Sequence, residues 1–113
     1  MAVLLSWVLG IVLTLVGIAG FFTGDMLLMF EINTIHNVIH LLSGLVGLYA
    51  ASKGAGYARQ YLMIFGIIYG VVAVLGFTMD GNVLGLLHAN TADNYLHLAI
   101  AVVSIVVGFG KKS

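Results

Sequence analysis

The chain has 113 residues, of which 62% are hydrophobic and 7% charged, and its acidic and basic side chains balance. Soluble domains carry about 25% charged residues, so this composition indicates an integral membrane protein. The absence of cysteine excludes disulfides, thiol catalysis and iron–sulfur clusters. The four basic residues fall at two separate places and form no patch for nucleic acid.

A helix needs roughly 20 apolar residues to cross a bilayer. The predicted spans are residues 2–22, 34–51, 61–77 and 91–109. Little chain remains outside them, so we predict an all-α polytopic membrane four-helix bundle forming a single membrane domain over residues 1–113. We expect no enzymatic activity, because the chain shows no nucleophile–base set and no phosphate loop.

The first span carries small residues at intervals of three or four, which places them along one side of a helix that should face another helix. These residues are Gly10, Thr14, Gly17, Gly20 and Gly24. Two short apolar segments, residues 26–30 after the first span and residues 83–87 in the second half, are too short to cross the membrane. Both fit either an interfacial or a re-entrant segment.

The second span begins with Asn33 as the predicted N-cap. Steps of three or four from there reach His36 and His40, and then Gly44 and Gly47. The histidines therefore share the small-residue side and should point into protein. At 1.5 Å per residue, His40 lies about 10 Å inside the capped end. A polar turn over residues 52–59 is predicted to end this helix.

The fourth span begins with Asn90 as its predicted N-cap, and Asp93 lies three residues later, where a carboxylate suits the positive end of a helix. One side of this helix carries His97, and two residues that continue the same side are Ala101 and Ser104. The third span has a comparable side, formed by Gly66, Gly70 and Ala73.

The two halves of the chain repeat one pattern. Residues 33–41 and 90–98 both read N-T-x-[H/D]-N-x-x-H-L. We therefore predict two tandem helical-hairpin repeats, residues 1–57 and 58–113. Because each repeat has two spans, both insert the same way round and are related by a pseudo-twofold axis along the membrane normal. His40 and His97 then lie at the same depth.

The charges predict the orientation. All basic residues lie in the middle connection or the C-terminal tail, and the acidic residues lie in the other two connections or, for Asp93, at the adjoining start of the fourth span. By the positive-inside rule, both termini are cytoplasmic and the histidines lie toward the extracytoplasmic side. Trp7, Tyr57 and Tyr61 fit an aromatic belt at the cytoplasmic surface, and Tyr95 fits the opposite belt.

These motifs resemble those of a family of small bacterial four-span membrane proteins classed as a domain of unknown function. The family pattern is N-x-x-H-N-x-x-H-L-x-x-G-x-x-G, met by residues 33–47, and N-x-x-D-N-x-L-H-L, met by residues 90–98. The A-x-x-Y at residues 58–61 and the L-G-F at residues 75–77 also match. The resemblance covers most of the chain and implies a multi-pass protein of the bacterial cytoplasmic membrane. It carries no activity or cofactor.

Polar residues inside spans usually face partners, so they are the candidate site. They are Asn33, His36, Asn37, His40, Asn90, Asp93, Asn94 and His97. The favoured interpretation is a structural cluster in which Asn37 and His40 hydrogen-bond Asn94 and His97 across the pseudo-twofold axis. Such interhelical bonds average about 0.6 kcal/mol but fix helix register. The protein would then be structural or accessory, in contact with lipid, and a homo-oligomer or a subunit of a larger membrane complex.

Two alternatives stay open. His36 and His40, at i and i+4, can hold one metal ion from a single helix, with His97 and Asp93 completing the site from the fourth span. Two histidines can also ligate haem, although so small a bundle leaves little room for the macrocycle. The second alternative is proton or ion conduction, or pH sensing, by the histidines. For conduction across the whole membrane, the cytoplasmic halves of the second and fourth spans provide only three polar side chains, namely Ser43, Tyr49 and Ser104.

Overall fold

The computed structural model describes residues 1–23, 26–27, 30–31, 33–79, 82–83, 87–88 and 90–110. Within these residues lie four helices, α1 (Ala2–Gly20), α2 (Thr34–Lys53), α3 (Ala55–Thr78) and α4 (Thr91–Phe109). Each is long and apolar enough to cross a membrane, which confirms the predicted all-α, four-span fold.

Short antiparallel ladders connect the two helices of each hairpin. The strands are β1 (Met26–Leu27), β2 (Phe30–Glu31), β3 (Asn82–Val83) and β4 (Leu87–His88). β1 pairs with β2, and β3 pairs with β4. The ladders include the ends of the two short apolar segments, residues 26–30 and 83–87. Residues 28–29 and 84–86 lie outside the described part of the chain. Their interfacial or re-entrant position stays a prediction.

The predicted polar turn over residues 52–59 is wrong. α2 continues to Lys53 and α3 already begins at Ala55, which leaves Gly54 alone between the two helices. Gly54 has φ 120°, a conformation that glycine adopts readily and other residues rarely do. The polar residues Arg59 and Gln60 lie inside α3, because both are compatible with a helix, so polarity does not mark the end of a helix here. At the other end of the first hairpin, α1 ends at Gly20, two residues earlier than predicted.

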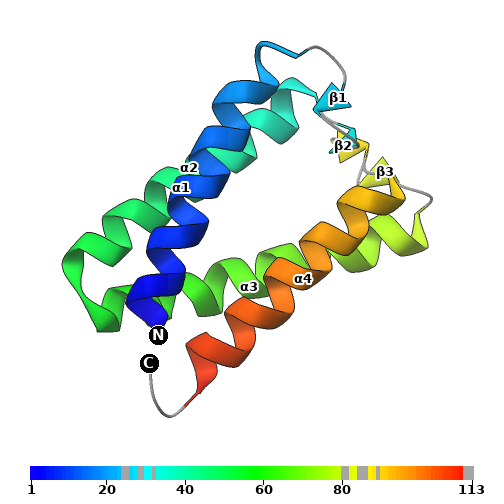
Figure 1. The fold of residues 1–113 in the computed structure, drawn as a ribbon. Helices are drawn as coiled ribbons and strands as arrows, with labels where there is room; N and C mark the ends of the chain where they lie inside the picture. Colours follow the sequence, from blue (N-terminus) through cyan, green and yellow to red (C-terminus); the bar gives the residue numbers. More distant parts are fainter. Residues whose placement is uncertain are drawn as a thin grey trace.

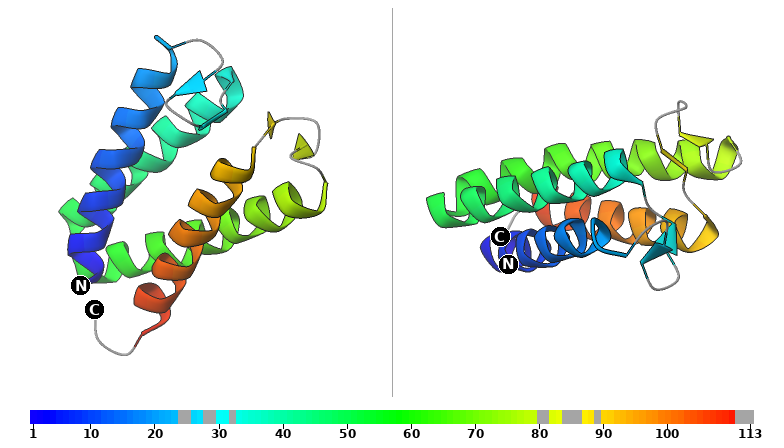
Figure 2. Two further views of the ribbon diagram at one scale, coloured as in Figure 1. Left: turned by 45° about the vertical axis from the view of Figure 1, so that its right-hand side comes forward. Right: turned by 90° about the horizontal axis from the view of Figure 1, so that it is seen from above.

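The helices form two hairpins. α1 packs along α2 and α3 along α4, whereas contacts between the hairpins are fewer (Figure 1). The hairpins diverge from the end of the molecule where both termini lie (Figure 2). Near that end, buried side chains from α1, α2 and α3 form a shared core of Ala2, Ala50, Ala58, Tyr61 and Leu62. A smaller core of Leu13, Tyr69 and Ala101 joins α1, α3 and α4 farther along.

Glycines allow the helices of each hairpin to approach closely. A Cβ atom at Gly10 would lie 2.8 Å from Leu48 of α2, and one at Gly66 would lie 2.9 Å from Ile105 of α4. Such contacts require a side chain or helix to shift. The predicted small-residue sides of α1 and α3 are therefore the sides that pack within the hairpins.

Two neighbouring glycines of α3 provide a matched test of this packing. Gly66→Ala is expected to lower the stability of the folded protein by about 1–3 kcal/mol, because overpacking forces α3 and α4 apart. Gly70→Ala should be tolerated, because its Cβ would meet only the Ala101 Cβ, at 3.7 Å. Unfolding of both variants in detergent, followed by circular dichroism, measures the difference. Equal stability of the two variants would contradict the packing account.

Hydrogen bonds to backbone carbonyls join the helices inside the bundle. The Ser6 hydroxyl donates to the Gly47 carbonyl at 2.7 Å, and the Tyr61 hydroxyl donates to the Ser43 carbonyl at 2.9 Å. Tyr61 is only 3% exposed, so its predicted place in a surface aromatic belt is wrong. Its ring packs in the core between the hairpins, where the hydroxyl finds an acceptor. Tyr57 and Tyr95, by contrast, are 57% and 61% exposed.

Candidate metal centre

The polar residues of the two motifs lie in the first turns of α2 and α4, which begin after the N-caps Asn33 and Asn90. The Asn33 side chain accepts a hydrogen bond from the backbone N–H of His36 at 2.7 Å. The Asn90 Oδ1 accepts from the backbone N–H of Asp93 at 2.9 Å, and the Asp93 Oδ2 accepts from the backbone N–H of Asn90 at 3.0 Å. The second pair is a capping box. Both predicted N-caps are confirmed.

His36 and Asp93 occupy the same position in the two motifs but serve different purposes. The carboxylate of Asp93 caps its own helix, as the hydrogen bond to Asn90 shows. The imidazole of His36 is 1% exposed and lies against two other histidine rings. The arrangement around the histidines is therefore asymmetric, with two contributed by α2 and one by α4.

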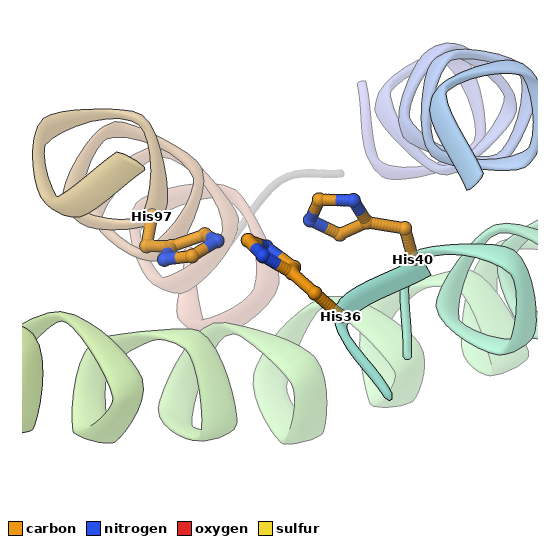
Figure 3. Close-up of side chains that lie close together, drawn as sticks. All are labelled: His36, His40 and His97. Carbon is orange, nitrogen blue, oxygen red and sulfur yellow. The ribbon is translucent and has the colours of Figure 1, made fainter. Parts of the chain in front are cut away.

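Three histidine side chains meet between α2 and α4. The ring centroids of His36 and His40 are 4.3 Å apart, those of His36 and His97 5.4 Å, and those of His40 and His97 6.0 Å. Each ring offers one nitrogen such that all three nitrogens lie within 4.8 Å of one another. In Figure 3 the His36 ring lies between the other two. We call these three residues the histidine centre.

The histidine centre is buried, and several of its polar atoms lack partners. His40 and His97 are 3% and 2% exposed. Among the described residues, neither ring nitrogen of His40 has a hydrogen-bond partner, and the same holds for His97 Nδ1. A buried polar group left without a partner costs about 1–3 kcal/mol. His40 and His97 thus present nitrogen atoms that the rest of the described protein does not satisfy.

The predicted hydrogen bond between His40 and His97 does not form in the described part of the chain. Neither ring nitrogen of His40 has a hydrogen-bond partner among the described residues, so the His40 side chain does not hydrogen-bond His97. Asn37 packs against Gly20 of its own hairpin and Asn94 against Gly76 of the other. The side-chain oxygens of both asparagines also lack hydrogen-bond partners in the described part of the chain. Each amide therefore faces the glycine of a neighbouring helix.

The eight predicted site residues thus divide by position. His36, His40 and His97 come together, as the metal hypothesis requires. Asp93, the fourth predicted ligand, is not part of that group. Its carboxylate is 1% exposed and bonds the start of α4, because a residue three positions after an N-cap Asn points back toward the cap.

One neighbour of the histidine centre was not singled out from the sequence. Tyr69 of α3 is 2% exposed, and its ring packs edge-on against the His97 ring with centroids 5.6 Å apart. A lone tyrosine in an apolar span gives little signal by itself. The spacing of Tyr69 is informative, because it follows Gly66 by three residues and precedes Ala73 by four. This spacing places Tyr69 on the buried side of α3.

Comparison with known proteins identifies the family. No curated protein matches the chain, and no solved structure does. A family model described as a domain of unknown function, DUF4383, matches residues 4–110. This match covers nearly the whole chain, including α2, α3, α4, all but the first two residues of α1, and the histidine centre. The chain therefore belongs to the DUF4383 family of domains of unknown function.

Proposed function

We propose that this chain is a small, non-enzymatic membrane protein that binds one transition-metal ion through His36, His40 and His97. The observation that carries this proposal is the meeting of three buried imidazoles from two helices, with nitrogens within 4.8 Å of one another. Both His40 nitrogens lack a partner among the described residues, and a bound ion supplies one. This replaces the hydrogen-bond cluster as the better account of the site.

The donor set indicates the class of ion. Neutral imidazole suits Zn²⁺, copper, nickel and iron, whereas Mg²⁺ and Ca²⁺ prefer oxygen ligands. Nitrogens that bind one Zn²⁺ at 2.0–2.1 Å in tetrahedral geometry lie about 3.4 Å apart. The nitrogens of the histidine centre lie within 4.8 Å of one another, so ion binding would draw them closer together. Three protein ligands leave the fourth position to water or to a small ligand.

The same geometry argues against haem. A haem held by two histidines requires its ligands on opposite faces of a flat macrocycle. His36 and His40 come from one side of α2, and the His36 ring lies between His40 and His97 (Figure 3). A macrocycle between His40 and His97 would have to displace His36. A single ion fits the three rings without such a rearrangement.

A proton path is less well supported than an ion site. Of the three polar steps considered from the sequence, Tyr49 is 61% exposed and so lies outside the bundle interior. Ser43 and Ser104 are buried. The Tyr61 hydroxyl donates to the Ser43 carbonyl, so the Tyr61 hydroxyl is engaged with the backbone.

The orientation proposed from the charges predicts on which side of the membrane the histidine centre lies. The hairpins make equivalent close contacts, Gly10 against Leu48 and Gly66 against Ile105, which supports a duplicated unit. A duplicated two-span unit inserts both copies the same way round. With both termini cytoplasmic, as the positive-inside rule favours, the histidine centre lies toward the outer side of a bacterial cytoplasmic membrane. Ions would then reach it from outside the cell.

The proposal is tested by ion binding to protein purified in mild detergent and stripped with a chelator. Isothermal titration and equilibrium dialysis with Zn²⁺ are expected to give one ion per chain. His40→Ala and His97→Gln should lose this binding, since each removes a ligand. Asp93→Asn should keep it, because that side chain caps a helix and the amide oxygen can still accept the bond from the Asn90 N–H.

Circular dichroism of each variant verifies that the helices remain. Wild-type protein that binds no Zn²⁺ would overturn the proposal. So would unchanged affinity in a folded His40→Ala or His97→Gln variant. Loss of binding in Asp93→Asn alone would move the site to the start of α4.

A further inference from the structure

The hairpins are joined unevenly along their length. Near the chain termini, the shared core includes Ala2, Ala58 and Leu62, all completely buried. Toward the opposite end, α2 and α4 have almost no close backbone contact, although the first turns of both helices carry the polar motif. The histidine centre meets there, with His36 and His40 on one side and His97 on the other, and β2 of the first hairpin also contacts α4. Side chains and not backbone packing therefore bridge α2 and α4 at this end.

The covalent link between the hairpins offers little resistance to a change in their angle. A single residue, Gly54, separates α2 from α3. A Cβ atom at this glycine would meet nothing within 4 Å, so no other part of the chain fills the space on that side of Gly54. Glycine also has the widest choice of backbone conformations. The link is placed at the end where the hairpins converge, which is where a hinge has to lie (Figure 2).

We infer that the bound ion is a clamp that holds the histidine-bearing ends of α2 and α4 together, and that the hairpins separate there when the ion leaves. This inference rests on the proposed function and adds a conformational consequence to it. Closed, the protein offers three imidazoles to the ion. Open, it offers only the His36 and His40 pair of α2.

The difference in ligand number supplies the thermodynamic reason. A ligand shifts a conformational equilibrium only through its different affinities for the two states. Three ligands hold the ion more tightly than two, so the ion favours the closed state. Without the ion, the closed state buries His40 nitrogens that have no described partner. Separation of the ends lets these nitrogens reach water, which favours opening.

Distances between spin labels test the clamp, and the natural lack of cysteine allows labels to be placed without background. Ile35→Cys on α2 and Tyr95→Cys on α4 form the pair near the histidine centre; both side chains are exposed, at 44% and 61%. Tyr49→Cys and Val106→Cys form the control pair at the converging end, with exposures of 61% and 66%. Pulsed electron double resonance is recorded in lipid nanodiscs with chelator and with Zn²⁺.

Zn²⁺ is expected to shorten and narrow the distance distribution of the first pair and leave the control pair unchanged. His97→Gln in the labelled background should abolish the change. Equilibrium dialysis of the same labelled samples separates the two proposals. Bound Zn²⁺ with an unchanged first-pair distance would overturn the clamp and leave the ion site standing. Failure to bind Zn²⁺ in labelled and unlabelled protein would overturn both. If labels at Ile35 and Tyr95 prevent Zn²⁺ binding while the unlabelled protein binds it, Val38→Cys and Leu98→Cys replace that pair. A shortened distance with Zn²⁺ then supports the clamp, and an unchanged distance overturns it.

Discussion

Saturating Zn²⁺ is expected to raise the free energy of unfolding by about 4 kcal/mol when free ion exceeds its dissociation constant 1,000-fold. The ion binds a site assembled from α2 and α4, which unfolding takes apart. Unfolding in detergent with Zn²⁺ or with chelator measures the increment. His40→Ala and His97→Gln should abolish this stabilisation by Zn²⁺, because each variant leaves only two of the three histidine ligands.

The same variants behave differently without the ion. In chelator, His40→Ala removes nitrogens that have no described partner in the closed state, where leaving them buried costs about 1–3 kcal/mol, so the variant relieves this cost in the closed state. The cavity that the smaller side chain leaves opposes this gain. We therefore expect little net change in stability in chelator and a large loss only relative to the Zn²⁺-loaded protein. An equal loss of stability in both conditions would show that His40 is a packing residue and not a ligand.

Ion selectivity is expected to be nearly complete between transition metals and the hard cations. Zn²⁺, Cu²⁺ and Ni²⁺ should each saturate one site, whereas Mg²⁺ and Ca²⁺ should give no binding over the same concentrations. Three imidazoles supply nitrogen donors only, and the nearby Asp93 carboxylate is engaged in a helix cap. Hard cations bind where carboxylate and carbonyl oxygens converge. Competition titrations against a chromophoric chelator measure these affinities.

Two observations would contradict this selectivity. Displacement of Zn²⁺ by millimolar Mg²⁺ would mean that oxygen ligands dominate, which would assign the site to Asp93 and its surroundings. A Soret band that forms with added haem and disappears in His97→Gln would mean that the histidine rings rearrange to admit a macrocycle. Asp93→Asn is the matched control for the first observation and should leave the preference for Zn²⁺ unchanged.

The local features of the chain could be predicted because each depends on neighbours in sequence. Spans follow from runs of apolar residues, and N-caps follow from Asn33 and Asn90 placed just before those runs. The prediction failed where polarity was taken for the end of a helix, since only Gly54 separates α2 from α3. It failed again at Tyr61, whose aromatic ring suits either a membrane surface or a buried site with an acceptor.

By itself, the sequence determined which residues form helices long and apolar enough to cross a membrane and which side of each helix is buried, because both properties follow from hydrophobicity and the period of a single helix. It placed His36 and His40 on one side of α2 and His97 on the buried side of α4. Only the tertiary structure decided that these three rings meet, that Asp93 turns back to its cap, and that Tyr69 lies beside His97. Those outcomes depend on the rotation and crossing of helices far apart in the chain. Glycine contacts within the hairpins and the core between them set that arrangement, and no local pattern encodes it.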